Sequence, residues 1–199
     1  MEWTIPIQKL ELGYINIGHQ WTNIQRRGDY IQKPMAPLSY FGPQFRLPSL
    51  SILFPPLVIL EHNTSSGKLV LDMGDASLAN IKLMAFQETL MNSIFYHQAS
   101  WFKSSYTKEE IRAGFIPIFN ENKLILHCPI LSGTPKGIPV YKKGTWTKNI
   151  TSQDILPGTR IRIAVKIHGI SFLHNSVSDL RWSGRCRLQH RITGIIHIN

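Results

Sequence analysis

A regular alternation of charged and branched apolar side chains runs from Arg160 to His168. Successive side chains of a β-strand point to opposite faces, so this order places the cations on one face and the isoleucines and valine on the other. The residues on the charged face are Arg160, Arg162, Lys166 and His168. The pattern predicts an amphipathic strand with one face in the core and one basic face.

A second stretch, from Arg181 to Thr193, repeats this alternation. Trp182, Cys186, Leu188 and Ile192 share the apolar parity, which predicts that Trp182 packs in the core. The residues of the opposite parity are Arg181, Ser183, Arg185, Arg187, Gln189 and Arg191. Gly184 marks a site where a β-bulge would shift this register.

The net charge of the chain lies entirely in its second half. Residues 100–199 hold 15 Lys+Arg and 5 Asp+Glu, whereas residues 1–99 hold 7 of each, so 15 − 5 = +10 equals the formal net charge. Like charges that face one another across strands repel by a few tenths to about 1 kcal/mol per pair. Each single cation is also compatible with a merely solvated sheet surface, but the group as a whole predicts a polyanionic partner.

The remaining periodicities predict an α+β fold that is mainly β. A helix from Ser77 to about Gln98 is expected to bury the apolar stripe Ile81, Met84, Leu90, Met91, Ile94 and Phe95. A short helix begins at Thr107, where Glu110 has the capping-box spacing. Strands are expected at 57–61 and 68–72 as a hairpin, and at 115–119, 123–127, 138–141, 161–167, 185–192 and 195–198.

We therefore expect an OB-like antiparallel barrel, or an open sandwich, covered by one long helix. This domain spans residues 51–199. Residues 1–50, rich in proline, form a strand and loop segment packed on the core.

Between the basic strands lies an aromatic-flanked basic turn. Cations of this kind follow phosphates while flat rings stack on bases, a combination typical of single-stranded nucleic-acid sites. Trp146 is the preferred stacking residue, although a tryptophan that closes the end of a barrel is an equal alternative. The candidate residues of the turn are Tyr141, Lys142, Lys143, Trp146 and Lys148.

The sequence lacks the usual signatures of catalysis. It contains no Gly-rich phosphate loop, no His-Glu-x-x-His and no Cys-x-x-Cys motif. We therefore expect no enzyme activity, no cofactor and no metal site, and we interpret Cys128 and Cys186 as buried thiols. No leader-like or membrane-spanning run is present, which predicts an intracellular protein without a membrane partner.

The order of short motifs in residues 57–198 resembles the single-stranded DNA-binding proteins of nucleocytoplasmic large DNA viruses and related eukaryotic DNA viruses. The motifs are a long helix ending in 97–102, then 107–111, 115–117, 138–141, 155–158 before the alternating strand, and 169–172 before the strand with Trp182. The resemblance implies an OB fold and a role in replication or recombination, in the host nucleus or a cytoplasmic viral factory. It would make the basic strands and the 142–148 turn the DNA-contacting parts.

These observations lead to one functional hypothesis and two alternatives. The chain is expected to bind single-stranded DNA without catalysis, through a basic groove that contains an aromatic side chain. A virion structural or assembly protein with a basic surface, and an RNA-binding protein, are the alternatives. Homo-oligomerisation is left open. The predicted contact residues are Tyr141, Lys142, Lys143, Trp146, Lys148, Arg160, Arg162, Lys166, Arg181, Arg185, Arg187 and Arg191.

Overall fold

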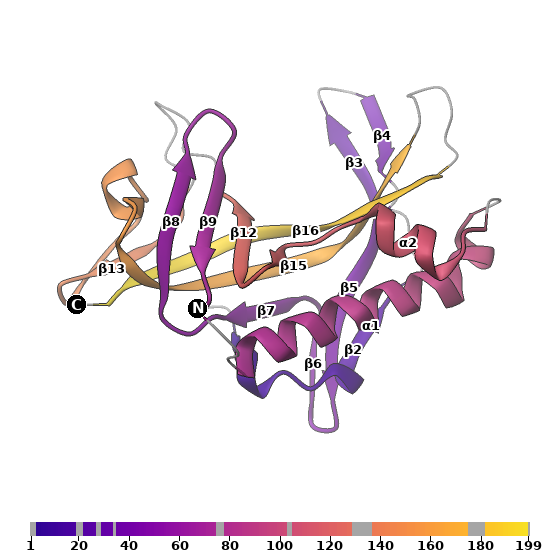
Figure 1. The fold of residues 1–199 in the computed structure, drawn as a ribbon, viewed down its shortest axis with the longest axis horizontal. Helices are drawn as coiled ribbons and strands as arrows, with labels where there is room; N and C mark the ends of the chain where they lie inside the picture. The colour runs from indigo at the N-terminus through magenta and orange to yellow at the C-terminus, as the bar shows by residue number, and fades with distance from the viewer. Residues whose placement is uncertain are drawn as a thin grey trace.

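Two long antiparallel strands, β15 (Arg160–His174) and β16 (Trp182–His197), form a ribbon that runs the length of the molecule (Figure 1). The computed structural model describes residues 3–18, 22–26, 29–33, 35–74, 78–102, 105–128, 137–174 and 182–198. The predicted strands at 185–192 and 195–198 are continuous in β16. Between these two parts of β16 the register with β15 shifts, at Ala164/Val165, and this β-bulge does not interrupt the strand.

Shorter strands pair along this ribbon and extend it into a mixed sheet of 14 strands. The other strands of this sheet are β1 (Ile5–Pro6), β2 (Ile15–Ile17), β5 (Met35–Gly42), β6 (Phe45–Leu47), β7 (Leu50–Leu53), β8 (Leu57–Asn63), β9 (Lys68–Asp72), β10 (Phe115–Ile116), β11 (Phe119–Asn120), β12 (Lys123–His127), β13 (Val140–Lys142) and β14 (Thr145–Thr147). A separate two-stranded sheet consists of β3 (Thr22–Arg26) and β4 (Asp29–Lys33). The predicted hairpin of β8 and β9 is confirmed.

The sheet does not close into a barrel, so that part of the predicted fold is wrong. Its main path runs β11-β12-β9-β8-β15-β16-β13-β14 without a pairing that joins its ends in the described residues. The expected antiparallel order is also incomplete, because β1 pairs with β7, β10 with β16, and β13 with β16 in parallel. The ribbon is longer than its neighbours, so β8, β7 and β5 pair with successive parts of β15.

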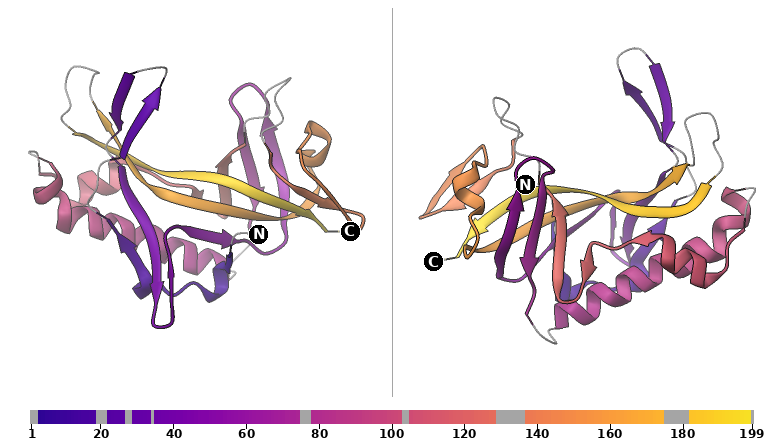
Figure 2. Two further views of the ribbon diagram at one scale, coloured as in Figure 1. Left: turned by 180° about the vertical axis from the view of Figure 1, so that it is seen from behind. Right: turned by 45° about the horizontal axis from the view of Figure 1, so that its top comes forward.

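Helix α1 (Leu78–Trp101) is the predicted long helix, and it lies on one side of the ribbon in Figure 1 and in both views of Figure 2. Its buried face differs from the predicted stripe. Leu90 and Ile94 are buried as expected, but Ile81 and Met84 are exposed, and Ala79, Leu83 and Phe86 are buried instead. The helix is apolar on several sides, so periodicity did not identify the side that packs.

A second helix, α2 (Lys108–Gly114), begins at the predicted Thr107 cap. The Thr107 side chain accepts a hydrogen bond from the Glu110 backbone N–H at 3.2 Å, and the Glu110 carboxylate accepts one from the Thr107 N–H at 2.8 Å. Three short 3₁₀ helices, η1 (Ile7–Lys9), η2 (Leu12–Tyr14) and η3 (Ser152–Ile155), complete the described elements.

One buried apolar cluster joins the helix, the sheet and the N-terminal segment. Ile7, Leu10 and Leu38 belong to it together with Leu83 of α1 and Ile163 of β15. Strand β7 spans the predicted boundary at residue 50 and pairs with β15. The first 50 residues therefore contribute both ladder pairing and core packing. The apolar side chains of the ribbon pack against this core, so its cationic side chains lie on the opposite side.

Candidate nucleic-acid interface

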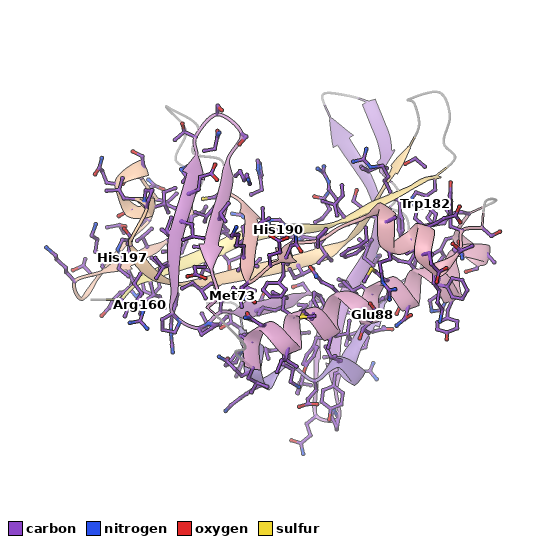
Figure 3. All side chains as sticks on the ribbon, in the orientation of Figure 1. Met73, Glu88, Arg160, Trp182, His190 and His197 are labelled. Atoms are coloured by element: carbon purple, nitrogen blue, oxygen red, sulfur yellow. The ribbon has the colours of Figure 1, made fainter. Side chains whose placement is uncertain are left out.

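The face of the β15–β16 ribbon that turns away from the core carries cations along most of its length. Arg162 and Arg187, for example, are exposed between neighbours that are buried. Figure 3 places Arg160 near one end of the ribbon and Trp182 at the other. We call six side chains the basic face: Arg160, Arg162 and Lys166 of β15, and Arg185, Arg187 and Arg191 of β16. The sequence alternation predicted this arrangement from these same residues.

The strand register shows that these cations are close neighbours. Lys166 lies directly opposite Arg191, and Ser171 lies opposite Arg187. Side chains two residues apart on one strand, such as Arg185 and Arg187, are separated by roughly 6.5–7 Å along the strand. From Arg162 to the position opposite Arg187 the ribbon extends roughly 25–30 Å at the usual rise per residue. The basic face is therefore elongated, as a surface that follows a chain of phosphates would be.

Carboxylates do not neutralise the arginines of this face within the described residues. Arg160, Arg162, Arg185, Arg187 and Arg191 take part in none of the ion pairs found there. Like charges at this density destabilise a sheet unless an anion offsets them. A bound polyanion would reverse that cost.

An aromatic pair, in which Trp146 is exposed and Tyr141 half-buried, continues the basic face at one end. Strands β13 and β14 form a hairpin whose turn residues Lys143 and Gly144 have φ of 49° and 82°, as a type I′ turn requires. Tyr141 and Trp146 face each other across it with ring centroids 5.2 Å apart, and Trp146 is 51% exposed. We call these two residues the Tyr–Trp pair.

The pairing of β13 with β16 connects this pair to the arginines. Tyr141 lies opposite Ile196 of β16, and Ile196 lies opposite Arg162 of β15. Directly opposite residues share a face of the sheet. Trp146, Tyr141, Ile196 and Arg162 therefore form one row across four strands, with an aromatic end and a cationic end.

The three predicted lysines of the turn have different positions. Lys142 has the other parity from Tyr141, and its Nζ lies 3.5 Å from Oδ1 of Asp154. We therefore leave Lys142 out of the proposed contact surface. Lys143 at the turn and Lys148 after β14 are both exposed. Arg181 lies outside the described residues.

No match to this chain is found among protein-family models, curated proteins or solved structures. The assignment of function consequently rests on the basic face and the Tyr–Trp pair.

Trp182 and Phe172 are core residues and do not belong to the interface. Trp182 is 1% exposed, which confirms the packing predicted from its parity, and its ring contacts Phe102, Tyr106 and Phe172. The indole Nε1 donates to the Arg185 carbonyl oxygen at 2.8 Å. This bond fixes the backbone of a residue on the basic face from the side of the core.

A histidine that sequence reasoning missed connects β12 to β16. The Nε2 atom of His190 accepts a hydrogen bond from the His127 backbone N–H at 2.9 Å. Burial lowers the pKa of His190. A hydrogen bond to the Leu188 carbonyl oxygen raises the pKa, whereas the charges of the neighbouring His127, Arg187 and His168 lower it. Because Nε2 accepts the bond from His127, the neutral form of the ring carries its proton on Nδ1, which lies 3.4 Å from the Leu188 carbonyl oxygen.

This histidine predicts that the protein loses stability in mild acid. Because its folded pKa lies below the unfolded value of 6.5, its contribution is complete above pH 6.5 and is lost as the pH falls further. The loss is about 1.4 kcal/mol per unit of pKa difference. Urea unfolding at pH 7.5 and pH 5.5 measures it. The His190→Gln variant, whose amide oxygen can accept the same bond, should depend less on pH; equal pH dependence in both proteins would contradict this assignment.

A second polar cluster anchors the Tyr–Trp hairpin from the opposite face. Burial acts to raise the pKa of Asp154, but two hydrogen bonds from Thr151 and the Lys142 ammonium outweigh it and hold the pKa below its usual value. His197 lies 3.9 Å from the same carboxylate, and burial lowers its pKa. The Thr-x-x-Asp spacing of 151–154 was the sequence signal for this cap.

Features that would indicate metal or thiol chemistry are lacking in the described part of the chain. No three His, Cys, Asp or Glu side chains there are grouped to hold a metal ion. Cys128 and Cys186 are buried, as predicted, and burial raises their thiol pKa values to about 11 and about 12. Neither described helix has the length and hydropathy of a membrane span.

Proposed function

We propose that this protein binds single-stranded DNA without catalysis, through the basic face and the Tyr–Trp pair, and acts in viral DNA replication or recombination. The observation that carries the proposal is the juxtaposition of these two features. Five arginines without a carboxylate partner in the described residues lie on one exposed face, and the Tyr–Trp pair with its exposed Trp146 continues that face. The proposed place of action is the host nucleus or a cytoplasmic viral factory.

The chemistry of the two features suits an unpaired strand. Phosphates bind cations whatever the sequence, and release of their counterions drives the association. Bases stack on aromatic rings only when their flat faces are accessible, as in a single strand. A ring such as Trp146, 51% exposed, offers that platform, whereas a duplex would present mainly its backbone.

The resemblance to viral single-stranded DNA-binding proteins supports the same function. We include a relationship to the OB fold in this proposal. The strands that would correspond to part of an OB sheet are β8, β9, β12 and the start of β15, and α1 would be the helix that packs on it. The DNA-binding proposal does not depend on barrel closure, because the cations lie along the β15–β16 ribbon.

Replacing Trp146 by alanine tests the stacking part of the proposal. We expect binding to a labelled oligothymidine to weaken about 10-fold, since one stacked base contributes about 1–3 kcal/mol. Fluorescence anisotropy measures the dissociation constant. Trp3→Ala is the matched control, because Trp3 is 83% exposed but lies in the N-terminal segment. An unchanged constant for Trp146→Ala would remove the Tyr–Trp pair from the interface.

Competition experiments separate this function from the alternatives. A matched RNA oligomer should compete less well than DNA; equal or stronger competition would favour an RNA-binding protein. Weak binding to every free oligonucleotide, together with stoichiometric recovery in purified particles, would favour a virion structural protein.

A further inference from the structure

The β15–β16 ribbon carries cations for phosphates but no aromatic platform for bases. The only Phe, Tyr or Trp residues of these two strands are Phe172 and Trp182, and both are buried. The outward positions between the cations are small or polar, as at Ala164, Ser171 and Gln189. Because base stacking requires an exposed flat ring, nucleotides along the ribbon are bound through their phosphates alone.

The Tyr–Trp pair provides stacking at one end of this surface only. Trp146 is 51% exposed, and its row across the strands leads to Arg162. At the other end Arg185 and Arg187 are exposed, but Trp182, which Figure 3 labels there, is buried in the core. A ligand therefore needs accessible bases at one end of its contact and only a phosphate backbone along the rest.

The spacing of the cations suits a paired backbone as well as an unpaired one. Arg162 and Lys166 are four residues apart on β15, and the same separation occurs on β16 between Arg187 and Arg191. Each interval is roughly 13 Å at the usual rise per residue. The major groove that separates the two phosphate rows of a duplex is about 12 Å wide. A duplex on the ribbon can therefore place phosphates of both its strands against these cations.

Charge density favours a duplex on the ribbon over a single strand. A duplex carries one charge per about 1.7 Å of its axis, and each neutralised phosphate contributes about 0.9 to the log–log salt slope, against about 0.7 in a single strand. The arginines of the basic face take part in none of the ion pairs of the described residues. Neither kind of backbone must displace a carboxylate from them.

We propose that the preferred ligand of this protein is DNA at a junction between duplex and single strand. The duplex lies along the basic face from Arg162 to Arg187, a length of roughly 25–30 Å that corresponds to about eight base pairs. The first unpaired bases of the overhang stack on the Tyr–Trp pair. This inference rests on the proposed function and deepens it, because it names a partly paired ligand for the same surface.

Four labelled ligands separate a junction from single strands in general. They are a duplex of about 16 base pairs with an overhang of about four thymidines, the same duplex with blunt ends, the overhang alone, and an unpaired strand as long as the tailed strand. The overhang is placed at the 5′ end in one duplex and at the 3′ end in another, and the tighter of the two is compared. Fluorescence anisotropy measures each dissociation constant.

The tailed duplex should bind at least as tightly as the long single strand, and about 10-fold more tightly than the blunt duplex, which is the effect of about one stacked base. Trp146→Ala should remove this 10-fold preference and leave the blunt duplex unchanged. Arg185→Gln/Arg187→Gln should weaken both duplexes about 10-fold or more but the short overhang little, because these arginines lie at the far end. Trp3→Ala, which removes an exposed ring of the N-terminal segment, is the matched control.

The single strand and the blunt duplex distinguish the ways in which the inference can fail. A tailed duplex that binds more weakly than the long single strand would overturn the junction and leave the single-strand function in place. Blunt and tailed duplexes that bind within about 3-fold of each other would overturn it too, because the Tyr–Trp pair would then contribute nothing to the choice of ligand. Failure of the long single strand to bind at low salt would contradict the proposed function itself.

Discussion

Replacing Arg162, Arg187 and Arg191 together by glutamine is expected to weaken binding to a single-stranded oligonucleotide by about 100-fold at 0.1 M salt. Each lost phosphate contact removes about 0.7 from the log–log salt slope, which corresponds to roughly 5-fold in affinity at that salt concentration. The three arginines are exposed on one face and lie in no ion pair within the described residues. Their removal therefore breaks no bond that the described fold uses.

The matched control removes the same charge from other surfaces. Lys9, Arg46 and Lys108 are exposed and lie off the β15–β16 ribbon. Changing all three to glutamine should alter the affinity by less than about 5-fold, because their effect is only that of net charge. If both triple variants lose affinity equally, net charge alone drives binding and the basic face is not a site.

Replacing Trp182 by alanine is expected to lower the free energy of unfolding by about 3–5 kcal/mol, the usual range for a buried tryptophan. The ring centroid lies 4.7 Å from that of Phe102 and 4.8 Å from that of Tyr106. Truncation also removes the indole bond to the Arg185 carbonyl. The total stability of a protein is typically about 5–15 kcal/mol, so this loss is large.

Urea unfolding measures this effect, with two variants for comparison. Trp182→Phe keeps an aromatic ring in the cluster and should lose less, while Trp146→Ala removes an exposed ring and should cost less than about 1 kcal/mol. A loss below about 1 kcal/mol for Trp182→Ala would mean that this cluster does not hold the end of the ribbon.

The alternation of charged and apolar residues predicted the central strands well, because such a pattern reflects only which of the two faces of a strand is buried. The order of Arg160–His168 is reproduced in β15, where the isoleucines are buried and most of the cations exposed. The same logic placed Trp182 in the core. Gly184 has a positive φ of 78°, and a register shift falls at this position, since Phe172 pairs with Cys186 but His174 pairs with Trp182, which confirms the predicted bulge. The alternation alone did not specify the other two shifts, at Ala164/Val165 and Ile167/Gly169.

Long-range pairing could not be predicted from periodicity. The parallel contacts of β10 and β13 with β16 join residues that are far apart in sequence, so the local pattern could not reveal them. The position of the Lys142 side chain also depends on contacts between residues that are apart in sequence. Its parity in the hairpin and the approach of Asp154 from η3 place it on the opposite face from Trp146.

The helix shows the limit of composition as a guide. Apolar residues such as Ile81 and Leu83 occur on both sides of α1, so the sequence predicted a helix but not its packed side.

The salt dependence of binding tests the central claim most directly. The dissociation constant of the wild type for a single-stranded oligonucleotide is measured by anisotropy over a series of salt concentrations. Engagement of four to six cations of the basic face predicts a log–log slope of about −3 to −4. A slope shallower than about −1, or no measurable binding at low salt, would contradict the account.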